Sequence, residues 1–68
     1  MELISTHFAH FNEQTHKSRA EVHKNNDLYE VHYYNNSGEL FKTENFTSEQ
    51  TAQTVAETWV IQIQVLKE

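Results

Sequence analysis

Residues 28–46, LYEVHYYNNSGELFKTENF, decide the fold of this 68-residue chain. Apolar and polar side chains alternate in both halves of the stretch, and aromatic and β-branched residues are frequent, as is typical of strands. Between the halves lies Gly38, the only glycine in the sequence. We predict strands over residues 28–34 and 39–46, joined by a three-residue loop, 36–38, in which Gly38 takes the left-handed conformation.

This loop also predicts which residues of the hairpin face each other. On one face it pairs Tyr33 with Phe41, Val31 with Thr43 and Tyr29 with Asn45. We expect this face to be the core face, because it holds aromatic residues and no charge. The other face places Glu30 opposite Glu44, and two facing carboxylates repel each other and belong in water.

Two further strands are predicted upstream of the hairpin. Residues 18–24 form the nearer one. A two-residue turn at residues 25–26 brings Ala20 and Val22 to the core face, opposite Val31 and Tyr29 respectively. The first strand covers residues 3–11. Its inward face has two solutions, because apolar side chains occur on both sides: Ile4 and Phe8, or Leu3, Ala9 and Phe11.

The C-terminal third of the chain predicts a helix over residues 48–67. Its apolar residues recur at helical spacing within roughly a third of a turn; they are Ala52, Val55, Ala56, Trp59, Ile63 and Leu66. Thr47 with Gln50 fits a capping box, and Ser48 is the alternative cap.

The predicted architecture is one α+β domain over residues 1–68. It consists of a four-stranded antiparallel β-meander with one C-terminal α-helix packed on one face, ββββα. The alternative is a three-stranded sheet with a loosely attached N-terminal arm. A domain of this size buries only about 60% of the surface that its unfolded chain exposes, so its core is small.

Composition and charge argue against several classes of protein. Ten acidic residues against five basic ones give a net charge of −5, which disfavours a nucleic-acid binder. Without cysteine there is no disulfide framework, Cys-based zinc site or iron–sulfur cluster. The sequence predicts neither a secretory signal nor a membrane helix, since the longest nearly apolar stretch is residues 59–66. We expect a cytoplasmic protein.

Histidine is the most unusual count, with five in the sequence: His7, His10, His16, His23 and His32. The predicted register places His23 and His32 on the outer face of the sheet, opposite neither each other nor a clear carboxylate. We interpret the histidines as solvated strand residues and predict no metal site.

Glu30 and Glu44 are interpreted as solubilising charges. No nucleophile motif or phosphate-binding loop occurs, so we predict no catalytic residue, no cofactor and no enzymatic activity.

Four apolar residues fall outside the predicted core. Ile61 and Val65 lie on the helix side away from Trp59, while Tyr34 and Leu40 lie on the outer face of the sheet. Self-association would bury these side chains and stabilise a domain whose own core rarely supplies more than about 3–5 kcal/mol. We predict a homodimer whose interface uses Ile61, Val65, Tyr34 and Leu40, singly or together.

Three segments, residues 3–8 (LISTHF), 29–31 (YEV) and 56–60 (AETWV), carry a resemblance. They are similar to small uncharacterised proteins of T4-like cyanophages, over most of the chain. The resemblance implies a phage accessory protein made in a bacterial cytoplasm, with a host protein as one partner to consider. Its motifs mark the sheet and helix core, so it transfers no functional residues.

These observations predict a non-enzymatic, homo-oligomeric interaction protein. Two alternatives belong to other functional classes. One is an acidic binder of a host protein, and the other is a histidine-based module that binds a metal or a small ligand.

Overall fold

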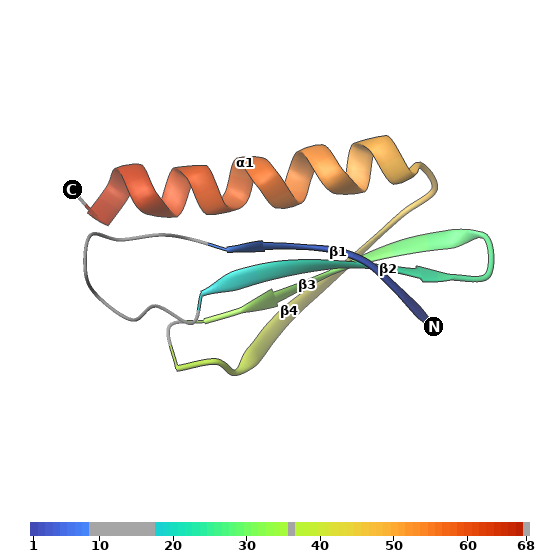
Figure 1. Cartoon of the computed structure of the whole chain (residues 1–68), viewed down its shortest axis with the longest axis horizontal. Helices are drawn as coiled ribbons and strands as arrows, with labels where there is room; N and C mark the ends of the chain where they lie inside the picture. The colour runs from blue at the N-terminus through green and yellow to red at the C-terminus, as the bar shows by residue number, and fades with distance from the viewer. Residues whose placement is uncertain (9–17, 36, 68) are drawn as a thin grey trace.

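Each strand of the sheet pairs antiparallel with its neighbour in sequence, in the order β1-β2-β3-β4. The elements are β1 (Glu2–Phe8), β2 (Arg19–Asn25), β3 (Leu28–Tyr34), β4 (Leu40–Phe46) and α1 (Glu49–Lys67). This computed structural model describes residues 1–8, 18–35 and 37–67, apart from the side chains of residues 64–67. Helix α1 lies along one face of the sheet (Figure 1). The predicted ββββα architecture is confirmed, and the alternative of a loose N-terminal arm is wrong because β1 pairs with β2 throughout.

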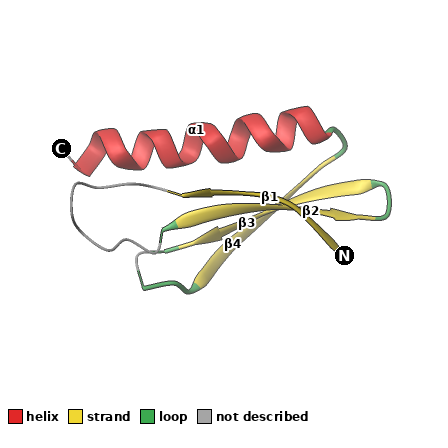
Figure 2. Cartoon of the chain, viewed as in Figure 1, coloured by secondary structure: helices red, strands yellow, loops and turns green. Residues whose placement is uncertain are grey.

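Figure 2 shows α1 covering one face of the sheet, which we call the inner face. This face carries the core. Its buried apolar side chains are Ala20, Val22, Val31 and Tyr33 from the sheet and Ala52, Ala56 and Val60 from the helix. Fully burying a valine contributes about 1.5–3 kcal/mol. The Trp59 ring meets the Tyr33 ring edge-on, with centroids 4.9 Å apart, which is a favourable aromatic geometry. The predicted inward positions are confirmed up to Ile63, Val60 is an additional core residue, and the side chain of Leu66 lies outside the described residues.

Ser48, one of the two predicted caps, begins the helix. Its Oγ accepts a hydrogen bond from the backbone N–H of Thr51 (3.4 Å), and its carbonyl accepts one from Ala52 (3.1 Å). These bonds satisfy groups that a helix N-terminus leaves unpaired. Glu49 in the first turn complements the helix dipole.

The turn between β2 and β3 corrects one prediction. Asn25 pairs with Leu28, so the two turn residues are Asn26 and Asp27 rather than residues 25–26. Asn26 has a φ of 60°, a left-handed conformation that asparagine tolerates better than most residues. Val22 therefore pairs with Val31 instead of Tyr29, and Ala20 with Tyr33 instead of Val31. Moving the turn by one residue changes the partner of each residue by two positions. Because side chains alternate with a period of two, the residues predicted to face inward still do so.

The turn between β3 and β4 begins as predicted. Gly38 has a φ of 84°, and the backbone of Asn35 bonds to both Gly38 and Glu39. One residue further on, the register shifts. Tyr34 pairs with Leu40 but Tyr33 pairs with Lys42, which leaves Phe41 as an extra residue, a β-bulge.

Because of this bulge, the residues of β4 after Phe41 lie on the opposite face of the sheet from the one predicted. Glu44 and Phe46 lie on the inner side, where Phe46 packs against the core, while Thr43 and Asn45 are exposed. The predicted pairs of Tyr33 with Phe41, Val31 with Thr43 and Tyr29 with Asn45 are wrong. The predicted Glu30–Glu44 contact is wrong as well, because Glu30 pairs with Asn45.

A second bulge, between Leu3 and Ser5, resolves the ambiguous first strand. Ile4 packs against the core, whereas Leu3 and Phe8 are about half exposed, at 53% and 51%. Neither predicted solution is correct as a whole, because a bulge puts neighbouring residues out of strict alternation. The predicted inward positions Ala9 and Phe11 lie outside the described residues.

Candidate functional site

Two glutamates and two histidines form a square on the outer face, the face of the sheet opposite α1. The pairing of β2 with β3 places Glu21 opposite His32 and His23 opposite Glu30. Like residues therefore lie on the diagonals, and the two imidazole rings stack with centroids 4.2 Å apart and planes 27° apart. We call these four residues the Glu–His square.

Hydrogen bonds along each strand hold the square together. The Nε2–H of His23 donates to Oε1 of Glu21, and that of His32 donates to Oε1 of Glu30, each at 2.9 Å. Asn25 Nδ2 donates to the second oxygen of Glu30 at 3.0 Å. The four side chains are only 14–16% exposed, although no other described element covers this face. They shield one another from water.

Two neighbours fix the carboxylate of Glu21. Arg19 Nε donates to its Oε2 at 2.9 Å, and the Arg19 guanidinium lies 3.7 Å from the centroid of the Tyr34 ring. The Tyr34 hydroxyl donates to Oε1 of the same carboxylate at 3.3 Å. Charge-assisted bonds and a stacked cation of this kind orient a side chain well.

Both carboxylates of the square stay ionised at neutral pH. Burial raises the pKa of Glu21, but the bonds from His23, Arg19 and Tyr34 and the charge of Arg19 together hold it below its ordinary value of 4.5. The bonds that Glu30 accepts from Asn25 and His32 lower its pKa, with a small opposing contribution from burial. The square therefore carries two negative charges, one of which Arg19 balances.

The Glu–His square overturns the interpretation of His23 and His32 as solvated strand residues. That interpretation depended on the misplaced β2–β3 turn, which kept the histidines away from the carboxylates. A signal was present in the sequence, because the tripeptide Glu-Val-His occurs twice, at residues 21–23 and 30–32. Pairing the central valines of two antiparallel copies brings each glutamate opposite a histidine.

Apolar side chains lie at both ends of the outer face. Leu3 and Leu28 lie near the β2–β3 turn, and Phe8 and Leu40 lie at the other end, as the pairing of the strands shows. All four are at least 40% exposed. The outer face is therefore apolar at its ends and polar in the middle.

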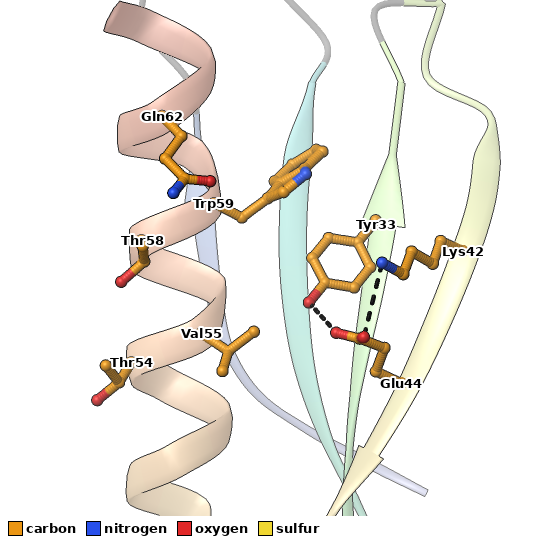
Figure 3. A pocket seen from close by; sticks show the side chains of 8 residues that line it. All are labelled: Tyr33, Lys42, Glu44, Thr54, Val55, Thr58, Trp59 and Gln62. Atoms are coloured by element: carbon orange, nitrogen blue, oxygen red, sulfur yellow. Dashed lines mark hydrogen bonds and ion pairs between the residues drawn. The ribbon is translucent and has the colours of Figure 1, made fainter.

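A groove of about 310 Å³ between α1 and the β3–β4 edge is the second candidate site (Figure 3). Its lining comprises Tyr33, Lys42, Glu44, Thr54, Val55, Thr58, Trp59 and Gln62. The Tyr33 hydroxyl donates to Glu44 at 2.6 Å, and Lys42 Nζ lies 3.6 Å from the same carboxylate. Burial, and then the bond to Glu44, raise the pKa of Tyr33 well above its ordinary value. This tyrosine serves as a hydrogen-bond donor and not as a base.

A polar contact between β1 and α1 was not predicted. Ser5 Oγ and His7 Nε2 both donate to Oε1 of Gln53, at 2.6 and 3.0 Å. Because His7 donates here, it does not accept the serine proton, and the three side chains form no nucleophile–base pair. They join the first strand to the helix.

The predicted interface residues do not form one surface. Leu40 is exposed on the outer face, and Ile61 is exposed on the helix, each at 52%. Tyr34 lies on the outer face as predicted, but its ring and hydroxyl are engaged by Arg19 and Glu21. The side chain of Val65 lies outside the described residues.

Comparison with known proteins gives no match to a family model, to a curated protein or to a solved structure. The resemblance to small cyanophage proteins therefore stays a prediction. Among the described residues, no helix combines the length and apolar character needed to cross a membrane.

Proposed function

We propose that this chain is a non-enzymatic interaction protein that pairs with a second copy of itself through the outer face of the sheet. The alternation of Glu and His in the square carries the proposal. A half-turn about an axis along the strands, between β2 and β3, places Glu21 of one copy over His32 of the other and His23 over Glu30. A half-turn about an axis across the strands also places glutamate over histidine, so each glutamate of one copy faces an imidazole of the other and not a second carboxylate.

The apolar ends of the outer face support the same arrangement. Either half-turn brings apolar ends against apolar ends, because both ends carry exposed side chains: Leu3 and Leu28 at one, Phe8 and Leu40 at the other. Removing these side chains from water is the main favourable contribution to association. Both half-turns also keep glutamate over histidine in the polar middle.

The size of the outer face is sufficient for a small dimer. Four strands of seven residues, at about 3.3 Å per residue and about 4.8 Å between strands, span roughly 23 by 19 Å. Two such faces remove on the order of 900 Å² of flat projected area, and side-chain relief adds to it. Specific interfaces begin near about 1,000 Å², so we expect a dimer that dissociates on dilution.

A matched pair of variants tests this surface, since Leu40 and Ile61 are equally exposed. Light scattering coupled to gel filtration should give twice the 8.1 kDa chain mass for the native protein and for Ile61→Asp. Leu40→Asp should give the monomer mass with an unchanged circular dichroism spectrum. A native protein that stays monomeric at about millimolar concentration contradicts the proposal. Dissociation by Ile61→Asp but not by Leu40→Asp would assign the contact to the helix instead.

Following the resemblance to cyanophage proteins, we place this self-association in the cytoplasm of an infected bacterium. Binding of a host protein through the acidic surface stays a prediction, and no arrangement of the described carboxylates favours it over self-association.

A further inference from the structure

We propose that Glu21, His23 and His32 form a binding site for one divalent transition-metal ion of the zinc class. The inference concerns the side chains of a single chain and does not depend on self-association. The ligand atoms of these three residues all lie within 4.8 Å of one another. Two ligands come from alternate positions of β2, and the third comes from the neighbouring strand β3.

This arrangement suits a metal because the ligands share one face and a rigid support. Side chains two residues apart on a strand point to the same side, so Glu21 and His23 both project outward. His32 projects outward from the position paired with Glu21. The backbone ladder between β2 and β3 fixes all three Cα positions, and only side-chain torsions are needed to adjust the site.

Binding an ion requires the two histidine side chains to turn. A tetrahedral zinc ion with ligands at about 2.0–2.1 Å holds those ligand atoms about 3.3 Å apart. The two imidazole rings, stacked at 4.2 Å, must swing apart so that their Nε2 lone pairs converge on the ion. Binding through Nε2 uses the other neutral tautomer of His23 and His32, in which the proton that Nε2 now directs at Glu21 or Glu30 sits on Nδ1.

The surroundings of Glu21 prepare it as a ligand. Arg19 donates to Oε2, while Oε1 faces Nε2 of His23 at 2.9 Å and accepts a bond from the Tyr34 hydroxyl at 3.3 Å. Such outer contacts commonly orient metal ligands and tune their affinity. The second carboxylate of the square, Glu30, adds a negative charge beside the site.

The donor set specifies the class of ion. Two imidazoles and one carboxylate suit zinc, nickel, cobalt or copper, whereas magnesium and calcium prefer oxygen ligands alone. Three protein ligands leave a fourth tetrahedral position open. Water or a ligand from a second molecule would complete the coordination.

Calorimetric titration of the chelator-treated protein with zinc chloride tests the site. We expect one zinc per chain and no saturable binding of magnesium. Because losing an outer-shell partner alone costs about 10–100-fold in affinity, replacing a ligand by His32→Gln or Glu21→Gln should weaken zinc binding by at least about 100-fold. His7→Gln is the matched control, because His7 faces the helix and should leave binding unchanged.

Two further measurements separate zinc held by these three residues from zinc held elsewhere on the chain or between two copies. In ¹⁵N spectra of the imidazoles, zinc should shift Nε2 of His23 and His32 and leave His7 in place. Leu40→Asp, which breaks the proposed dimer, should still bind one zinc per chain. Absence of saturable zinc, nickel and cobalt binding overturns the inference, and so does binding that survives His32→Gln undiminished.

Discussion

The two faces of the sheet are built from the same strands but by different means. Val22 and Val31 are the central residues of the two Glu-Val-His tripeptides, and both point inward and are fully buried under α1. The glutamate and histidine on either side of each valine form the square on the outer face. On the inner face, any apolar side chain of suitable size contributes to stability, whichever residue it is paired with. On the outer face, the chemistry depends on which residue stands opposite which. The inner face thus sets stability, and the outer face carries the proposed self-association surface and zinc site.

The largest expected difference between the faces comes from a buried charge. Val31→Asp places an unpaired carboxylate in the core, which costs about 3–5 kcal/mol or more, at least as much as so small a core supplies. We expect this variant to be unfolded in circular dichroism. Thr43→Asp, on the outer face, should stay within about 0.5 kcal/mol of the native protein in urea unfolding at a concentration where both are monomeric. Equal losses from both changes would show that the faces do not differ in this way.

A second comparison tests which side of β4 faces inward. Phe46 packs against the core, and its neighbour Asn45 is exposed. Phe46→Ala should lower the free energy of unfolding by about 2 kcal/mol, whereas Asn45→Ala should change it by less than about 0.5 kcal/mol. Urea titration followed by Trp59 fluorescence measures both. If Asn45→Ala were the more damaging change, β4 would have the register without the bulge.

The smallest effect concerns the edge of the inner face, where Tyr33 meets Glu44 and Lys42. Since folding raises the pKa of Tyr33 above 10, the unfolded chain loses this proton first, and stability should fall as pH rises above about 10. Tyr33→Phe should lose about 1–2 kcal/mol at neutral pH, because Glu44 loses its donor. Thermal unfolding between pH 8 and 11 should then show a shallower alkaline decline for Tyr33→Phe than for the native protein. Parallel declines would mean that other groups cause the loss.

The same contrast between the two faces explains which parts of the structure could be predicted from the sequence. Periodicity identified the helix, all four strands and the inward side of β2 and β3, because burial repeats along each element and tolerates an error in a turn. Gly38 located one turn, since a positive φ there favours glycine. Asn26 takes the same kind of backbone conformation without glycine, so the other turn was placed one residue early.

The outer site was missed for a physical reason. A one-residue error in that turn left Ala20 and Val22 facing inward but separated every glutamate from its histidine. The bulge at Phe41 has no strong sequence signal, because Leu40, Phe41 and Lys42 give no alternation that marks one residue as extra. Polar contacts such as those of Gln53 with Ser5 and His7 depend on how α1 lies over β1, which no local pattern encodes.

The extra residue at Phe41 also has a consequence for how this fold can diverge. A gene that lost the codon for Phe41 would restore continuous alternation in β4 and leave the later side chains on their present faces, because Lys42, Glu44 and Phe46 keep Tyr33, Val31 and Tyr29 as partners. Loss of a codon from the regular part of β4 would instead move every later residue of the strand to the opposite face. In related chains, a one-residue gap at residues 40–41 should therefore coincide with an unchanged hydropathy pattern over residues 42–46.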